Sequence, residues 1–481
     1  MKKSHILLGL ILSAVALNAA GQERYRRVPP PPEPHQELKL PVIETKPLTN
    51  GLRVSVVFRD DLPMMSLQLI IPGGESASPD RSPGTASCVA HLITRSTQLR
   101  SASDIEELLE SIGGSLSVMT LEDFTIFTFL FLDDYLDQAL NLLGQMILKP
   151  DFSEKAFKSV KSILSLDYLD REKDPEFVAY RHMIRLLFKN HPYEKMGFTR
   201  DAVKNWNQKD LLEFFDRYYR PDNAHLILMG RIQMDTATRK ASGVLNTWQP
   251  GEFSPKPLPP IIPPQKEKIC FIDVPMAKDC AIYLGSVFPS TNADIDPPSL
   301  SVVSQILGGT VNSRLFMNLR ESKAYAYFAF SEVAFNKASG LFCVRARVAP
   351  EFIYPSAQEI LKETRRIARE PISISEIDHA KSYLLGNFPI TIERLSALSE
   401  KMSEIMAYDR ENDYWNKYYQ QILLVSPEKV FEAAQKCFLQ PPLVVIAGDK
   451  SLLVDRLNEF ESIEVYDIKG IHQYTTNKEK Q

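Results

Sequence analysis

The sequence has few cysteines, no excess of charge of one sign and only one long hydrophobic run. Its 481 residues contain five cysteines at irregular spacing, which argues against a disulfide framework. They are Cys88, Cys270, Cys280, Cys343 and Cys437. Most lie in apolar segments, so we expect small buried side chains. The 56 Lys and Arg against 60 Asp and Glu give a net charge of -4, which argues against nucleic-acid binding.

The single hydrophobic run lies at the N-terminus. Lys2 and Lys3 precede the apolar residues 6–17, and small residues follow at 19–21, a layout typical of a secretory signal peptide. The run is shorter than the roughly 20 residues that a membrane span requires. We therefore expect residues 1–21 to be a signal peptide and the mature protein to be periplasmic. The alternative is an uncleaved membrane anchor.

Two proline-rich segments divide the rest of the chain. Residues 22–42 have the composition of an extended spacer, and residues 249–266 have that of a linker between domains. The sequence therefore predicts an N-terminal domain over 43–248 and a C-terminal domain over 267–470. The polar residues 471–481 are predicted to be a disordered tail.

The two predicted domains have similar patterns. Each begins with two alternating strands, at 51–59 and 66–74 in the first and at 268–274 and 280–286 in the second. Each ends in an apolar strand closed by a glycine, Gly230 in the first and Gly448 in the second. The separation of these glycines in the sequence is nearly the same as that of the corresponding earlier strands. This indicates an internal duplication. Strands followed by segregated helices predict α+β halves, each an antiparallel sheet with helices packed on it.

One helix in the first half has the frame of a zinc site without most of its ligands. The segment GTASCVAHLITRST covers Gly84–Thr97. An inverted zincin motif, H-x-x-E-H, provides two histidine ligands on one helical face and a glutamate base between them. Here serine, Ser87, stands at the first histidine position, alanine, Ala90, stands at the base, and only His91 remains. Loss of a ligand and of the base excludes zinc hydrolysis by this helix alone.

This helix and several other segments resemble the pitrilysin/insulinase-type zinc metallopeptidases, close to the mitochondrial processing peptidase branch. The other segments are NGLRVSVV at Asn50, IGGSLSVMT at Ile112–Thr120, YYRPDNAHLILMG at Tyr218–Gly230 and LGGTVNSRLFMNLRESKAYAYF at Leu307–Phe328. The resemblance covers both halves. It implies two homologous halves that form a half-clamshell, and it identifies the chain as a catalytically inactive subunit.

The resemblance also places a third metal ligand, a glutamate in the family, at Asp167. This aspartate shares a predicted inward stripe with Ala156, Val160 and Ile163, so it could be a shortened vestige of the ligand. Alternatively, it faces the helix surface or pairs with a neighbouring Arg or Lys. In either case we expect no complete catalytic site, no metal and no cofactor in this chain.

The sequence leaves two other interpretations of His91. A lone histidine is more often a hydrogen-bonded interior residue than a zinc ligand. Cys88 lies one turn away and could form a nucleophile and base with it, but a reactive cysteine also needs exposure and an oxyanion hole. We expect Cys88 to be a small buried thiol instead.

The second half retains a different part of the family's site. The family resemblance implies that Arg320 and Tyr327 hold the substrate's scissile carbonyl near the zinc of a partner, because they match an L-R-E-x-x-x-x-A-Y segment. The usual glycine-leucine pair is Ala324-Tyr325 here, so local packing could differ. Alternatively, Arg320 is a surface charge and Tyr327 the first large residue of a strand.

The resemblance implies a non-catalytic subunit of a periplasmic zinc endopeptidase heterodimer. The partner would be a homologous chain with an intact H-x-x-E-H motif and its zinc, and the substrates unfolded or extended peptides. The alternatives are a scaffold and a stand-alone peptide-binding protein of the same fold. Residues Ser115–Phe124 occupy the strand that pairs with peptides in the family, and here they either pair with a peptide or are only an edge strand of the sheet. Ser87 and Ala90 oppose an active zinc peptidase.

Overall fold

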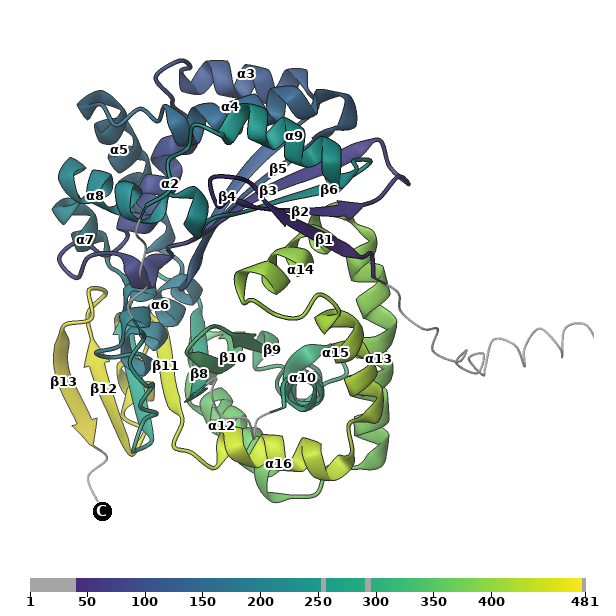
Figure 1. Cartoon of the computed structure of the whole chain (residues 1–481). Coiled ribbons are helices and arrows are strands. Elements are labelled where there is room, and N and C mark those ends of the chain that lie inside the picture. The colour runs from purple at the N-terminus through teal and green to yellow at the C-terminus, as the bar shows by residue number, and fades with distance from the viewer. Residues whose placement is uncertain (1–39, 252–256, 290–295, 478–481) are drawn as a thin grey trace, which may run out of the picture. The chain divides into compact units, whose positions relative to one another are not determined.

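The computed structural model describes residues 40–251, 257–289 and 296–477, which belong to one compact unit. Their strands form two sheets with helices packed on them, which confirms the predicted α+β class (Figure 1). The predicted signal peptide and most of the predicted spacer lie outside the described residues. Within the described part of the chain, no helix is long and apolar enough to cross a membrane.

The first half contains a sheet in the order β1-β2-β6-β3-β5-β4. Its strands are β1 (Ile43–Pro47), β2 (Arg53–Phe58), β3 (Met64–Pro72), β4 (Ser115–Thr120), β5 (Phe124–Leu132) and β6 (His225–Gly230). Its helices are α2 (Thr85–Arg95), α3 (Ala102–Ser111), α4 (Leu136–Leu148), α5 (Glu154–Arg171), α6 (Pro175–Leu187), α7 (Arg200–Asn205), α8 (Gln208–Tyr218) and α9 (Met234–Leu245). Short 3-10 turns include η1 (Glu75–Ala77) and η3 (Pro192–Gly197).

The second half contains a sheet in the order β13-β12-β7-β11-β8-β10-β9. Its strands are β7 (Lys268–Asp273), β8 (Cys280–Pro289), β9 (Ala326–Phe335), β10 (Ser339–Val348), β11 (Leu443–Gly448), β12 (Ser462–Tyr466) and β13 (His472–Asn477). Its helices are α10 (Pro297–Ser304), α11 (Arg314–Phe316), α12 (Ile353–Arg369), α13 (Ile374–Glu393), α14 (Leu395–Ala407), α15 (Tyr414–Leu424), α16 (Pro427–Phe438) and α17 (Val454–Leu457), with two π-helical segments, η5 (Gln305–Gly309) and η6 (Met317–Ser322).

The strand order confirms the internal duplication. Five strands of the first sheet, β2-β6-β3-β5-β4, repeat as β7-β11-β8-β10-β9 in the second. The expectation of purely antiparallel sheets is wrong, because β2 pairs with β6 and β7 with β11 in parallel. Strands β6 and β11 each follow a set of helices rather than a tight turn, and such a crossover connection permits parallel pairing.

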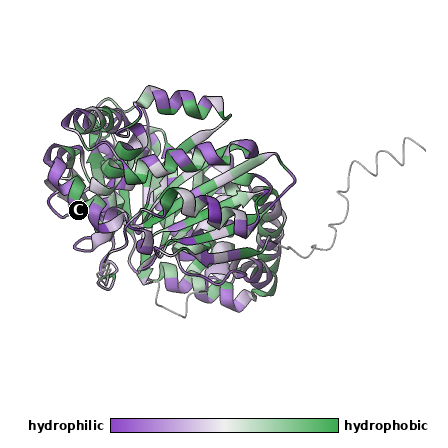
Figure 2. Cartoon of the chain, turned by 45° about the horizontal axis from the view of Figure 1, so that its top comes forward, coloured by the Kyte–Doolittle hydropathy of each residue, from purple (hydrophilic) through white to green (hydrophobic). Residues whose placement is uncertain are grey.

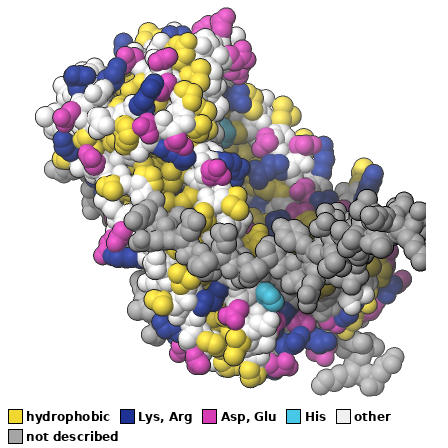
Figure 3. Space-filling view, turned by 90° about the vertical axis from the view of Figure 1, so that its right-hand side faces the viewer, with side chains coloured by type: hydrophobic (Ala, Val, Ile, Leu, Met, Phe, Trp, Pro, Cys, Tyr) yellow, Lys and Arg dark blue, Asp and Glu magenta, His cyan; other side chains and the backbone are white. Residues whose placement is uncertain are grey.

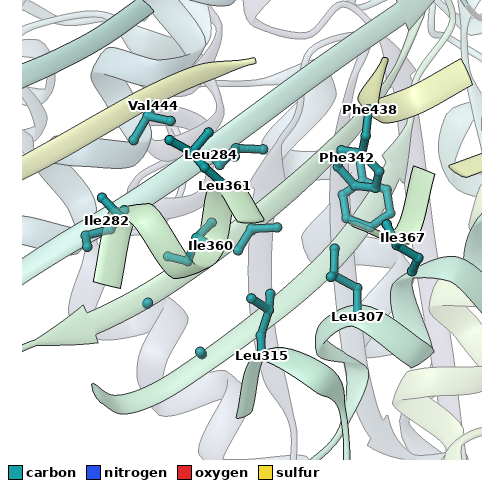
Figure 4. Close-up of a cluster of buried hydrophobic side chains, with 14 of the residues drawn as sticks. Ile282, Leu284, Leu307, Leu315, Phe342, Ile360, Leu361, Ile367, Phe438 and Val444 are labelled. Carbon is teal, nitrogen blue, oxygen red and sulfur yellow. The ribbon is translucent and has the colours of Figure 1, made fainter. Parts of the chain in front are cut away.

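Each sheet buries one face under helices of its own half. In the second half, Ile282, Leu284 and Phe342 of the sheet pack against Ile360 and Leu361 of α12 (Figure 4). Hydrophobic residues accordingly concentrate in the strands, whereas the outer helices alternate in hydropathy (Figure 2). All five cysteines are buried and unpaired, which confirms their assignment as core residues.

The two halves also exchange a helix. Helix α6 of the first half packs on the other face of the second sheet, where Val178, Met183 and Leu187 join an apolar cluster. Helix α14 of the second half packs in turn on β3 and β6 of the first sheet. Neither sheet is therefore covered by its own half of the chain alone, although the linker falls between them in the sequence.

The C-terminal end of the described residues is an ordered strand. The prediction of a disordered tail is wrong for His472–Asn477, which form β13 by antiparallel pairing with β12. Polar composition did not prevent this, because an edge strand is held by backbone hydrogen bonds rather than by burial of side chains. Acidic and basic side chains are mixed on the part of the surface left uncovered by grey atoms in Figure 3, in keeping with the small net charge.

Candidate functional site: a degenerate zinc helix and an exposed Arg-Tyr pair

The first turn of helix α2 encloses a buried carboxylate. Glu75 lies in η1 and is 1% exposed. One of its oxygens accepts hydrogen bonds from the Ser87 hydroxyl and from the Ser87 N–H at 2.9 Å. The other oxygen accepts from the Ser78 hydroxyl at 2.9 Å and from the Gly84 N–H at 3.0 Å. The carboxylate thus satisfies two of the free N–H groups at the start of the helix.

These hydrogen bonds give Ser87, at the position of the first histidine, a structural role. Ser87 is committed to Glu75, and burial raises the pKa of Glu75 while the hydrogen bonds from Ser87, Ser78 and Gly84 oppose that rise. Ala90, at the position of the glutamate base, is fully buried. Neither residue can bind a metal or activate water. The polar groups at this end of the helix stabilise the fold.

His91 and Cys88 are held in states that do not favour catalysis. The half-buried His91 ring makes no hydrogen bond within the described residues, so the interior hydrogen-bonded alternative is not observed. Burial and the charge of Arg95 lower the pKa of His91, and Asp167 opposes them. Cys88 is fully buried, and burial raises the pKa of its thiol to about 12. A neutral, enclosed thiol cannot act as a nucleophile.

Asp167 is on the surface of α5, so the prediction of an inward position is wrong. Its side chain is 58% exposed and lies 3.9 Å from Arg171, as the alternative interpretation expected. Ile163 is exposed as well. The buried stripe of α5 runs instead through Val160 and Tyr168, in steps of four residues, and therefore turns away from Asp167. Its charge still acts on the His91 ring.

The residues of this region do not fit a zinc ion. Among the residues that the structure describes, no three His, Cys, Asp or Glu side chains come together as metal ligands. A catalytic zinc site requires three protein ligands and an open position. His91 and Asp167 provide at most two, and Glu75 is used by four hydrogen-bond donors. We derive no chemistry through a metal on this chain.

Arg320 and Tyr327, by contrast, lie together at the start of β9. The Nη1 group of Arg320 donates to the Tyr327 carbonyl oxygen at 2.5 Å, and its guanidinium lies 5.2 Å from the centre of the Phe316 ring. The Arg320 side chain is 50% exposed, and Tyr327 is 57% exposed. The guanidinium retains further N–H donors beyond the one that Tyr327 accepts. Both side chains are therefore available to a molecule outside this chain.

The turn between the two residues has an unusual backbone. Arg320 belongs to the π-helical segment η6, a rare form that is frequent at functional sites. Ala324 then adopts a left-handed conformation with φ of 53°, which costs an alanine about 1 kcal/mol. The glycine that the family resemblance implies at this position would adopt this conformation without strain. The alanine at position 324, where the resemblance leads us to expect glycine, is therefore a strained residue.

Sequence reasoning found the pair but missed the residues that support it. Tyr325 stacks on Phe352 with ring centres 4.8 Å apart, and Lys323 pairs with Glu359 at 2.5 Å. Glu75 was missed too. It follows the strand-ending glycines Gly73-Gly74, but a lone glutamate in a loop gives no signal of its burial. The free edge of β4, the predicted peptide-pairing strand, is the outer edge of the first sheet in the described residues.

Comparisons with known proteins match both halves. The family profile described as "Insulinase (Peptidase family M16)" matches residues 56–197, and "Peptidase M16 inactive domain" matches residues 205–384. The chain is 25% identical over 355 residues to the non-peptidase homolog YmxG of Helicobacter pylori, covering 72% of this chain and 81% of that one. An uncharacterized zinc protease YmxG of Bacillus subtilis is 21% identical over 74% of this chain and 85% of its own.

Solved structures share the fold. A protease from Helicobacter pylori superposes with a TM-score of 0.79 at 21% identity, over 85% of this chain and all of that chain. A peptidase M16 inactive domain from Pseudomonas fluorescens gives a TM-score of 0.77 at 20% identity, over 85% and 98%. With both halves matched in order, the chain belongs to the insulinase-type M16 peptidase family, as an inactive member that lacks the complete zinc motif.

Proposed function

We propose that this chain is the non-catalytic subunit of a periplasmic zinc endopeptidase heterodimer. It closes the peptide chamber and donates Arg320 and Tyr327 to the zinc site of a homologous partner with an intact H-x-x-E-H motif. The observation that supports this is the exposure of Arg320 and Tyr327, in a chain whose own metal positions are Ser87 and Ala90. A guanidinium and a phenol are suitable donors to the oxyanion that develops during peptide hydrolysis.

The substrates are unfolded or extended peptides. Peptides of this kind pair with sheet edges through their main chains, which gives affinity with little dependence on sequence. The periplasmic location rests on the signal-like residues 1–21. A tag at the C-terminus would therefore leave secretion undisturbed and allow capture of the complex at native abundance. We expect a same-fold chain with H-x-x-E-H in stoichiometric amount, and capture of this chain alone would contradict the proposal.

The second test is activity of that native complex. Arg320→Ala should lower kcat by about 10²–10³-fold, the usual loss when one oxyanion donor is removed. Tyr327→Phe removes only the phenolic hydroxyl. The matched control is Arg239→Ala, an exposed arginine on α9. Full activity of the Arg320→Ala complex would overturn the donated-residue mechanism, as would zinc-dependent cleavage by this chain alone.

A catalytically dead peptide-binding or scaffold protein of the same fold is the second candidate. It is favoured by the open edge of β4, which could pair with a peptide without any chemistry. Such a protein would bind extended peptides tightly without a partner. Isothermal titration of the isolated chain with an unstructured peptide separates the two functions, because a donating subunit alone should bind weakly.

A further inference from the structure

The Arg320–Tyr327 pair sits on a turn that needs support from elsewhere in the fold. Ala324 has a left-handed backbone, and a non-glycine residue remains in such a conformation only where the surrounding structure fixes it. The backbone contributes two hydrogen bonds, from the Lys323 N–H to Asn318 at 3.1 Å and from the Tyr325 N–H to Leu319 at 2.8 Å. Both stay within the same segment and cannot orient it on the rest of the molecule.

Side-chain contacts of the residues around Ala324 converge on one helix. The Tyr325 ring stacks on Phe352, which immediately precedes α12, at an angle of 20° between the ring planes. Glu359, two turns further on, pairs with Lys323 at 2.5 Å and accepts from the Asn318 amide at 2.9 Å. Residues before and after Ala324 are therefore tied to the same end of α12.

Helix α12 is a rigid base for this purpose. Its residues Ile353, Ile360 and Leu361 are buried in the core of the second half, where Figure 4 shows Ile360 and Leu361 among the packed side chains. Leu315 of α11, just before the π-helical segment, belongs to the same core. A functional side chain is held most precisely when its support is locked by packing in this way.

We propose that Tyr325 and Phe352 are positioning residues, whose stacked rings hold the left-handed turn at Ala324 and thereby keep the Arg320 guanidinium and Tyr327 aligned before a partner binds. The Arg320 hydrogen bond to the Tyr327 carbonyl makes the two residues move as one unit with the turn. This inference rests on the proposed function, since it assigns the support of the donated pair. Neither positioning residue needs to contact the substrate.

The test is a double-mutant cycle in the native complex. Tyr325→Leu should lower kcat about tenfold with KM within twofold, because alignment rather than peptide binding is lost. Tyr325→Phe keeps the ring and should restore kcat to within twofold of the parent. In a background that carries both Arg320→Ala and Tyr327→Phe, Tyr325→Leu should have no further effect, since residues that act as a unit are non-additive. Tyr383→Leu, at an exposed tyrosine of α13, is the matched control.

The outcomes separate the two proposals. A tenfold loss that persists in the background with both Arg320→Ala and Tyr327→Phe, or an unchanged kcat in Tyr325→Leu, overturns the positioning role while leaving the donated pair intact. Unchanged activity of Arg320→Ala overturns the proposed function itself. Hydrogen exchange on the isolated chain provides a readout without the partner. Tyr325→Leu should speed exchange of residues 317–327 at least tenfold without affecting α12. Equal exchange rates in the parent and in the variant would contradict the inference.

Discussion

Two regions of this molecule, the start of helix α2 and the start of strand β9, correspond to parts of one active site in the family resemblance and differ in how their polar groups are used. At the start of α2, the buried carboxylate of Glu75 is paired with the partly buried Ser87. At the start of β9, Arg320 and Tyr327 point outward on a strained turn that is supported from behind. The groups at α2 are used inside the fold, whereas the exposed pair at β9 keeps hydrogen-bond donors free at the surface, as the proposed function requires.

The difference has an energetic side. Replacing buried, mutually bonded groups leaves unsatisfied donors and costs stability, whereas truncating an exposed side chain costs little. The α2 region should therefore respond to substitution in unfolding experiments. Truncation of Arg320 should leave the unfolding curve nearly unchanged and, under the proposed function, lower only the activity of the complex. The predictions below separate the two regions on this basis.

Restoring the lost motif should have the largest effect. The double substitution Ser87→His with Ala90→Glu should destabilise the chain by about 4 kcal/mol or more, because it places a carboxylate where Ala90 is fully buried and breaks the contact with Glu75. Urea denaturation measures the loss. Titration calorimetry with zinc should detect no tight site, since α5 presents no inward ligand. Stoichiometric zinc binding by a stable variant would show that the site is only two substitutions from function.

Neutralising the buried carboxylate should have the next largest effect. Glu75→Gln should cost about 1–3 kcal/mol, because an amide cannot accept from donors on both of its terminal atoms. The contrast is Arg320→Ala, which should leave the free energy of unfolding within about 0.5 kcal/mol. Denaturation curves of both variants give the comparison directly. Equal losses would mean that the exposed pair also supports the fold.

The sequence revealed the kinds of residue at both sites but not their orientation. The family resemblance identified Ser87, Ala90 and Arg320, and the repeated sequence pattern predicted two similar halves. The inward stripe on α5 was misjudged, because its true repeat of four residues, from Val160 to Tyr168, differs from the predicted one by a small rotation. No local sequence pattern reveals the roles of the remaining residues. Glu75 acts from a loop on the start of α2, and Tyr325 stacks on Phe352 from a different segment of the chain.

The pH dependence of stability should be a smaller effect. Burial lowers the pKa of His91 in the folded state, so the unfolded state binds the proton more tightly. The free energy of unfolding should therefore decrease as the pH falls through the pKa of an unfolded histidine, about 6.5. His182 and His225, whose pKa values burial lowers to about 3, add the same trend. His91→Asn should therefore lose less stability than the parent between pH 7 and pH 5. The exposed His379→Asn should follow the parent.

The smallest effect should come from Asp167, the position of the family's third ligand. Asp167→Asn should change the free energy of unfolding by less than about 0.5 kcal/mol, because an exposed ion pair at 3.9 Å contributes little. It should nevertheless lower the pKa of His91 further, since the Asp167 charge favours the protonated ring. An NMR titration of the His91 ring in the two proteins detects that shift. An unchanged His91 pKa would mean that the Asp167 charge does not act on the ring, and a loss of stability as large as that of Glu75→Gln would place Asp167 inside the α2 region rather than at its surface.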